Sequence, residues 1–456
     1  MPAATIASPL SLMADVVPIS SGDTAWVLIS TALVLLMVPG LAFFYGGLVR
    51  SKSALNTMLM SLGALAIVSV QWVLFGYSLA FSPGSSWIGG LAFAGFRGVG
   101  AVANPTYAAA LPHLIFAGFQ AMFAGITVAL FSGAVVDRMR FVAYLAFGLL
   151  WSTLIYDPLA HWVWGEGGWL RTLGALDFAG GTVVHISAGI TALVLATVLG
   201  PRRDFKRVPT VPHNVPFALL GAGLLWFGWF GFNAGSALAA DGIAANAFVT
   251  THVAAATALI AWLAIEIFKN GRATAVGAAT GAVVGLVAIT PAAGFVTPLS
   301  AIAIGLLAAP CSFFALNYRA STKLDDTLDV FACHGVAGIV GALLTGVFAT
   351  KTVNPNGADG LLAGNAKLLG VQSVAVLATI AFVGAGSFAI ISALRLVMKL
   401  RIPIDAEVAG IDISEHGEEA YHGSDLSDLT GRSPSLGDAV VLPASEMYGS
   451  VVQLPR

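Results

Sequence analysis

Two stretches of sequence decide the fold: HISAGITALV at residues 185–194 and HGVAGIVGAL at residues 334–343. They align without gaps and share His, Ala, Gly and Ile at matching offsets, and each follows an aspartate, Asp177 or Asp329. A shared pattern of this kind predicts an internal repeat. Apart from their histidines both stretches are almost wholly apolar, so the repeat sets an ionisable group in the same apolar surroundings twice.

The composition places this repeat in a membrane. Of the 456 residues, 57% are hydrophobic and 10% are charged, and the mean hydropathy is +0.88, whereas a soluble domain carries about 25% charged residues. The net charge of -2 excludes a nucleic-acid binder with a basic footprint. Both cysteines, Cys311 and Cys333, lie in apolar runs, so we expect neither a disulfide framework nor a cysteine-rich metal site.

Eleven apolar segments are long enough to cross a bilayer, which takes roughly 20 residues. The sequence therefore predicts an all-α polytopic membrane protein with eleven transmembrane helices. The histidine stretches fall in the fifth and tenth segments, and a repeated five-helix unit must invert its topology because five crossings change sides. We predict a 5+5 inverted repeat plus an eleventh helix, with His185 and His334 close together where such folds place the substrate pathway. The segments lie at about residues 24–47, 54–81, 113–135, 140–164, 177–199, 215–239, 244–268, 272–290, 298–318, 328–350 and 367–399.

The basic residues predict the orientation, because Lys and Arg are retained on the cytoplasmic side. One set of alternate loops holds fifteen of them and the other set holds four, with two more in the tail. This asymmetry predicts an extracytoplasmic N-terminus and a cytoplasmic C-terminus in a cell (inner) membrane. The fifteen are Arg50, Lys52, Arg138, Arg140, Arg202, Arg203, Lys206, Arg207, Lys269, Arg272, Arg319, Lys323, Arg395, Lys399 and Arg401, and the four are Arg97, Arg171, Lys351 and Lys367.

The chain divides into three parts. Residues 1–20 form an extracytoplasmic N-terminal segment without a basic region, so a cleaved signal peptide is poorly supported. Residues 21–400 form the transmembrane domain. Residues 401–456 form an acidic cytosolic tail, which we expect to be disordered after about residue 423.

The two repeated histidines are the strongest functional signal. A single intramembrane histidine could equally be a structural group bonded to a neighbouring helix, but two at equivalent repeat positions favour a substrate pathway, because ionisable groups in a bilayer are costly. No further cluster of His, Cys or carboxylate side chains completes a zinc site, so we expect no metal and no cofactor.

From about Gly22 to His422 the chain resembles the ammonium transporter (Amt/Mep/Rh) family, on its bacterial Amt side. The resemblance implies an eleven-helix pore for ammonium or ammonia, with methylammonium as an analogue, inside each protomer of a homotrimer. The motifs that carry it are GDTAW (22–26), PGLAFFYGGLVR (39–50), GFQAMFAGIT (118–127), AHWVWGEGG (160–168), GALDFAGGTVVHISAG (174–189), WFGWFGFNAGSAL (226–238), TPAAGFV (290–296) and DVFACHGVAGIVG (329–341).

The resemblance also implies roles for individual residues. An external recruitment site would consist of Trp164, Phe119 and Ser236, and a gate of stacked phenyl rings would consist of Phe119 and Phe232. The pore would be lined by His185, His334 and Trp229. Residues 411–422 resemble the family's regulatory segment, which would support docking of a PII-type signalling protein, with its acidic residues paired to basic loops that include Arg202, Arg203 and Arg207. A plain solvated tail is the alternative.

The chemistry of these residues favours deprotonation. A bare cation in a medium of dielectric about 4 costs on the order of 20 kcal/mol, whereas neutral ammonia loses only a few hydrogen bonds. A neutral imidazole can accept or relay the proton of ammonium, a step that potassium cannot take. Whether a proton follows each ammonia along the histidines is left open.

Two aspartates are expected to have structural roles. Asp177 and its repeat equivalent Asp329 are expected to cap helix starts, and Asp177 would also stabilise the recruited cation at a distance.

An ammonium sensor that signals through its tail is the main alternative function, and a channel for another small neutral molecule is a weaker one.

Overall fold

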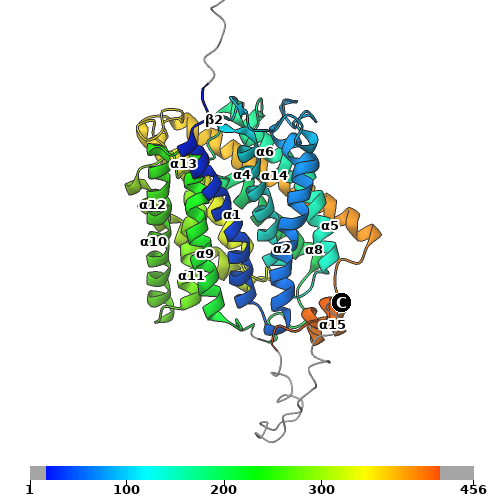
Figure 1. The fold of residues 1–456 in the computed structure, drawn as a ribbon. Helices are drawn as coiled ribbons and strands as arrows, with labels where there is room; N and C mark the ends of the chain where they lie inside the picture. The colour runs from blue at the N-terminus through cyan, green and yellow to red at the C-terminus, as the bar shows by residue number, and fades with distance from the viewer. Residues whose placement is uncertain (1–16, 209, 422–456) are drawn as a thin grey trace, which may run out of the picture.

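The computed structural model describes residues 17–208 and 210–421, and these form one helical bundle (Figure 1). A two-stranded antiparallel sheet of β1 (Ala103–Asn104) and β2 (Ala108–Pro112) lies at the end where α1 begins. We call this the α1 end and the opposite one the α15 end. The longer helices are α1 (Ser21–Leu48), α2 (Ala54–Gln71), α4 (His113–Phe131), α5 (Phe141–Trp151), α8 (Ser187–Leu199), α9 (Val215–Ala234), α10 (Gly242–Asn270), α11 (Ala275–Ile289), α12 (Pro298–Ser321), α13 (Ala337–Phe348) and α14 (Ala366–Val397).

Short helices join or extend the long ones. Among the described residues they are η1 (Ser51–Ser53), η2 (Trp72–Gly76), α3 (Tyr77–Phe81), η3 (Ala94–Phe96), η4 (Ser132–Ala134), η5 (Ser152–Tyr156), α6 (Asp157–Trp164), α7 (Trp169–Leu173), η6 (Gly181–Ile186), η7 (Gly235–Ala237), η8 (Phe331–Val336), η9 (Leu361–Ala363), α15 (Ile404–Ala409) and η10 (Asp412–His416).

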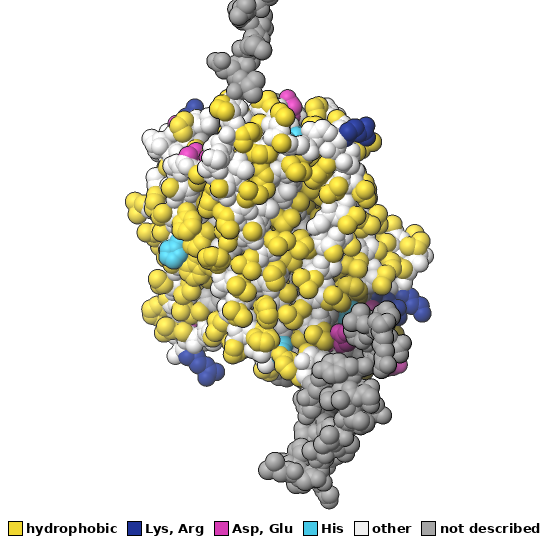
Figure 2. All heavy atoms as spheres, in the orientation of Figure 1, with side chains coloured by type: hydrophobic (Ala, Val, Ile, Leu, Met, Phe, Trp, Pro, Cys, Tyr) yellow, Lys and Arg dark blue, Asp and Glu magenta, His cyan; other side chains and the backbone are white. Residues whose placement is uncertain are grey.

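Ten continuous helical segments in the described part of the chain are long and apolar enough to span a membrane. They correspond to ten of the eleven predicted segments. The remaining one, at about residues 272–290, is the apolar helix α11, which has only 15 residues. The face of the molecule in Figure 2 is mostly hydrophobic between the two ends, and its visible Lys and Arg side chains lie toward the ends. The multi-pass α-helical prediction is thus confirmed.

Glycines let the two halves of the predicted repeat meet. Gly189 and Gly338 are the glycines that both repeat stretches share. A Cβ on Gly189 would overlap the backbone of Gly335, and one on Gly338 would lie 3.2 Å from Cβ of His185. Small residues permit this close approach of membrane helices, so the repeat brings its histidines together through its glycines.

Both histidines lie on π-helical turns. His185 is in η6 and His334 is in η8, and each turn continues into an α-helix, α8 or α13. A π-turn holds an extra residue, and such turns occur frequently at functional sites. The turns therefore set the direction in which each imidazole leaves its helix.

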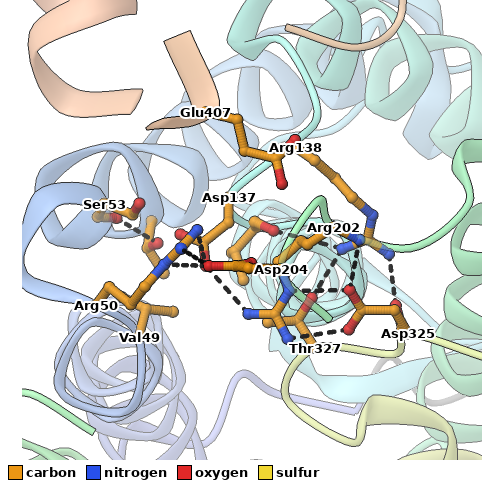
Figure 3. Close-up of polar contacts among 12 residues, drawn as sticks. Val49, Arg50, Ser53, Asp137, Arg138, Arg202, Asp204, Asp325, Thr327 and Glu407 are labelled. Carbon is orange, nitrogen blue, oxygen red and sulfur yellow. Dashed lines mark hydrogen bonds and ion pairs between the residues drawn. The ribbon is translucent and has the colours of Figure 1, made fainter. Parts of the chain in front are cut away.

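Ion pairs join the loops at the α15 end (Figure 3). Arg202 contacts both carboxylate oxygens of Asp325, with Nε–Oδ2 at 2.9 Å and Nη2–Oδ1 at 3.0 Å, and its Nη1 lies 3.1 Å from Asp137. Arg138 donates to the Thr327 hydroxyl at 2.8 Å. Burial alone would raise the pKa of Asp325, but its hydrogen bonds to Arg202 and the positive charges of Arg138 and Arg202 together hold that pKa below its ordinary value. Burial lowers the pKa of Arg138 to about 10.

Candidate functional site

The two repeat histidines are in direct contact, as predicted. Nδ1 of His334 lies 3.3 Å from Nδ1 of His185, and the rings are nearly parallel at 23° with centroids 5.4 Å apart. Both side chains are buried. Because one Nδ1 must donate and the other accept, a neutral pair presents one Nε2 that accepts and one Nε2–H that donates. Nε2 of His185 has no partner among the described residues.

Apolar side chains surround this pair. Both histidines line a narrow cavity of about 10 Å³. This volume is close to the roughly 10–15 Å³ that one water-sized molecule needs. Trp229 stacks on His185 at 5.4 Å and 21°, and its indole N–H donates to the Thr290 hydroxyl at 2.9 Å. The other lining side chains are Met37, Leu41, Phe44, Ile126, Leu130, Val184, Leu225, Phe232 and Val283.

The stacked phenyl pair differs from the prediction. Phe232 faces Phe123, with ring centroids 4.3 Å apart at 31°, and the expected pairing of Phe119 with Phe232 is wrong. Phe119 lies one helical turn earlier on α4, where its ring meets Phe123 edge-on at 4.9 Å. A Cβ on Gly235 would be 3.0 Å from the Phe119 ring, so Phe119 fills the contact between α4 and the end of α9.

An outer cavity of about 220 Å³ lies beyond the phenyl pair. Two of the three predicted recruitment residues, Trp164 and Ser236, line it, but Phe123 takes the place of Phe119. The Trp164 indole N–H donates to the carbonyl of Asp177 at 2.9 Å. The Ser236 hydroxyl donates to the carbonyl of Phe232 at 2.8 Å, so its oxygen lone pairs are left to accept.

The predicted cap at Asp177 is confirmed. Its carboxylate accepts the backbone N–H groups of Gly180 and Gly181 at 2.7 Å each and of Thr182 at 2.8 Å, and it also contacts the Thr182 hydroxyl. These are the free N–H groups at the start of η6. Asp177 thereby fixes the turn that carries His185.

The repeat equivalent of Asp177 is Asp326, so the choice of Asp329 was wrong. Asp326 accepts the N–H groups of Val330 at 3.1 Å and Phe331 at 2.7 Å, at the start of η8. It precedes its histidine by eight residues, as Asp177 does. Asp329 instead has a positive φ of 57° and pairs with Arg319 at 2.6 Å.

A wider cavity of about 410 Å³ continues from His334 toward the α15 end. Its lining includes Cys333, Asp329 and Arg319. Burial raises the pKa of Asp329 to about 7, against the opposing effect of Arg319. The outer cavity, the narrow cavity and this wider cavity together form a candidate path through the bundle. The histidines line its narrowest part.

Sequence reasoning missed several lining residues. Phe123 lies in the quoted GFQAMFAGIT motif, four residues after Phe119, and the equal offset from the histidines would have identified Asp326. Gln120, Arg171 and Tyr107 line the outer cavity without a sequence signal that singled them out.

The acidic residues Asp412 and Glu415 of the tail contact helix starts rather than arginine side chains. Asp412 accepts the N–H groups of Leu55 at 2.9 Å and Asn56 at 2.8 Å, and Glu415 accepts that of Phe141 at 3.2 Å. Helices α2 and α5 have no capping side chain from their own N-cap residues. The expected pairing of this segment with Arg202 is wrong, since Arg202 binds Asp137 and Asp325. The expectation that a cleaved signal peptide is poorly supported and that of disorder after about residue 423 concern residues 1–16 and 422–456, which lie outside the described ranges.

A multi-pass helical bundle with a buried histidine pair in a narrow apolar cavity is typical of membrane transport proteins. A family model described as the Ammonium Transporter Family matches residues 25–421. The chain is 50% identical over 404 residues to an ammonium transporter of Bacillus subtilis, covering 88% of this chain and 99% of that protein. The chain belongs to the ammonium transporter family.

Solved structures agree with this assignment. The crystal structure of Candida albicans Mep2 is 36% identical, with a TM-score of 0.82, and the match covers 89% of this chain and 92% of that one. A protein described as a sensor Amt protein is 31% identical with a TM-score of 0.80, and the match covers 87% of this chain and 98% of that one.

Proposed function

We propose that this chain transports ammonium by taking up the cation, removing its proton and conducting ammonia past the histidine pair. The observation that carries the proposal is the Nδ1 to Nδ1 contact of His185 and His334 in a narrow, otherwise apolar passage. Moving an ammonium-sized ion into such a medium costs on the order of 20 kcal/mol by the idealised Born estimate. Ammonia avoids this cost, and the pair's Nε2 groups offer it one acceptor and one donor.

Recruitment would take place in the outer cavity. The aromatic faces of Trp164 and Phe123 attract a cation by about 0.5–2 kcal/mol, and the Ser236 oxygen accepts an N–H hydrogen bond. Asp177 acts at a distance, because its carboxylate is occupied by the N–H groups of η6. The Phe123–Phe232 pair would gate the passage between this cavity and the histidines.

Discrimination against potassium would follow from the removal of a proton from ammonium. Potassium can occupy the aromatic site, but it has no proton to transfer to an imidazole and cannot shed its charge. Electrogenic transport requires that the proton also crosses, and the histidine pair is the proposed route.

Currents from proteoliposomes test this proposal. We expect currents with ammonium and methylammonium but not with potassium, and His185→Asp should change this selectivity. His213→Gln is the control, because His213 is partly exposed and lines none of the three cavities of the path. Equal potassium and ammonium currents in the wild type would overturn deprotonation.

We infer eleven crossings, with the N-terminus outside and the C-terminus in the cytosol of the cell (inner) membrane. The α1 start and α15 lie at opposite ends of the bundle (Figure 1), which requires an odd number of crossings. Ten helices meet the length criterion, and α11 would be the eleventh.

A homotrimer is the assembly that we propose. His252 is exposed on a membrane-spanning helix, where its ring lies beside that of Trp226 with centroids 5.4 Å apart. Polar groups facing lipid are unfavourable. A neighbouring protomer would cover His252.

The tail supports a regulatory role. It holds the starts of α2 and α5, so a PII-type protein that binds it could act on the bundle. The similarity to a sensor Amt protein favours sensing as the second candidate function. Growth of a transport-deficient host on limiting ammonium separates the two, because no rescue despite correct insertion would favour the sensor.

A further inference from the structure

A fourth cavity, of about 340 Å³ and lined mainly by charged residues, opens at the α15 end beside the wider cavity, and neither histidine lines it. Its walls come from segments that are distant in sequence: the end of α1, the start of η1, the loop after α8 and the helix α15. Four cationic side chains and two carboxylates line it, together with Val208 and Val408. The charged residues are Arg50, Lys52, Arg203, Arg207, Asp204 and Glu407.

Both carboxylates already have partners, and Figure 3 shows that of Asp204. Asp204 accepts from Nη1 of Arg50 at 2.8 Å. Glu407, which is 4% exposed, accepts the backbone N–H of Arg203 at 2.6 Å and Nη2 of Arg401 at 2.8 Å. Neither carboxylate is therefore free to neutralise the remaining cations of the cavity.

Three of the four cationic side chains have no carboxylate partner among the described residues. The guanidinium groups of Arg203 and Arg207 are exposed and make no hydrogen bond or ion pair with any residue that the structure describes. Lys52 Nζ donates to the carbonyl of Val408, which does not neutralise it. Lys52, Arg203 and Arg207 thus line the cavity without an ion-pair partner among the described residues.

We propose that this cavity binds a phosphate group. Guanidinium groups bind phosphate oxygens in a bidentate manner, and the lysine adds a compact positive charge. A carboxylate ligand is a poorer fit, because a phosphate brings more charge and three acceptor oxygens. Because α15 provides one wall, a bound phosphate holds the tail against the loop after α8.

Two sources carry this chemistry, an anionic lipid headgroup and a soluble phosphate. Inorganic pyrophosphate, titrated calorimetrically into the purified full-length protein, should bind saturably and slow hydrogen exchange in Ile404–Ala409. Arg203→Gln with Arg207→Gln should weaken this binding at least about tenfold. Arg272→Gln with Lys323→Gln removes the same charge from exposed sites outside the cavity and should change it less than about twofold.

Vesicles separate the two sources. The protein is reconstituted in phosphatidylcholine with or without phosphatidylglycerol, and retained lipid is counted by native mass spectrometry. Phosphatidylglycerol kept by the wild type and lost from the cavity variant supports the site as a headgroup site, and pyrophosphate binding without such retention supports it as a site for soluble phosphate. Absence of saturable binding for both probes, or equal weakening by both double variants, would overturn the proposal.

Discussion

Phe123 and Phe232 stack with their centroids 4.3 Å apart, and they separate the outer cavity from the histidine pair. Phe119, one turn away on the same helix, lines neither cavity. Position on α4 therefore decides which phenylalanine lines the outer cavity.

Replacing these two phenylalanines gives a matched test. Phe123→Leu should raise the ammonium concentration for half-maximal uptake about 2- to 30-fold, because the aromatic face that supplies about 0.5–2 kcal/mol of cation attraction is lost. Phe119→Leu makes the same change in a side chain that lines neither cavity and should leave this concentration within about twofold. Uptake of labelled methylammonium into proteoliposomes measures the effect of both variants. A larger effect of Phe119→Leu than of Phe123→Leu would assign the cation contact to Phe119.

Arg171 lines the outer cavity as a cation without an ion-pair partner in the described structure. Arg171→Gln should lower the half-saturating ammonium concentration by a few-fold at low salt, and the gain should shrink at about 1 M salt, where the screening length is about 3 Å. Lys351→Gln, at an exposed position that does not line this cavity, is the control. A gain that is insensitive to salt would contradict an electrostatic cause.

The aspartates before His334 differ in their expected effect on stability. Asp326→Asn should lower the free energy of unfolding by about 1–2 kcal/mol, because one of two charged bonds to the η8 backbone is lost. Asp329→Asn breaks a partly exposed pair with Arg319, for which about 0–1 kcal/mol is typical. Thermal unfolding in detergent compares the variants, and a larger loss for Asp329→Asn would reject Asp326 as the cap.

Asp412 should determine whether the tail stays docked. Asp412→Ala removes the cap of α2, a loss of about 1–2 kcal/mol, so hydrogen exchange in Asp412–His416 should accelerate roughly 5- to 30-fold. Asp405→Ala is the control, because Asp405 is exposed and no hydrogen bond of its side chain is present in the described structure. Similar exchange in both variants would mean that the contact to Leu55 and Asn56 does not hold the tail.

The fold and the centre of the site could be predicted from the sequence, because both depend on patterns of period and repetition. Apolar runs fix the spans, and the repeated H–x–x–A–G–I pattern predicted the contact between His185 and His334. Phe119 and Phe123 lie four residues apart on one helix, and periodicity alone cannot tell which of them reaches Phe232. The contacts of Asp412 join segments more than 350 residues apart, and no local pattern contains that information.

The π-helical turns make the site sensitive to chain length in a way that substitutions do not reveal. In each half an aspartate anchors the turn and the histidine follows eight residues later. Removing one residue between them would convert the π-turn to an α-turn and rotate the imidazole by about 100° around its helix, away from its partner. We therefore expect that neither interval, 177–185 or 326–334, tolerates an insertion or a deletion. Engineered variants should keep both intervals at constant length.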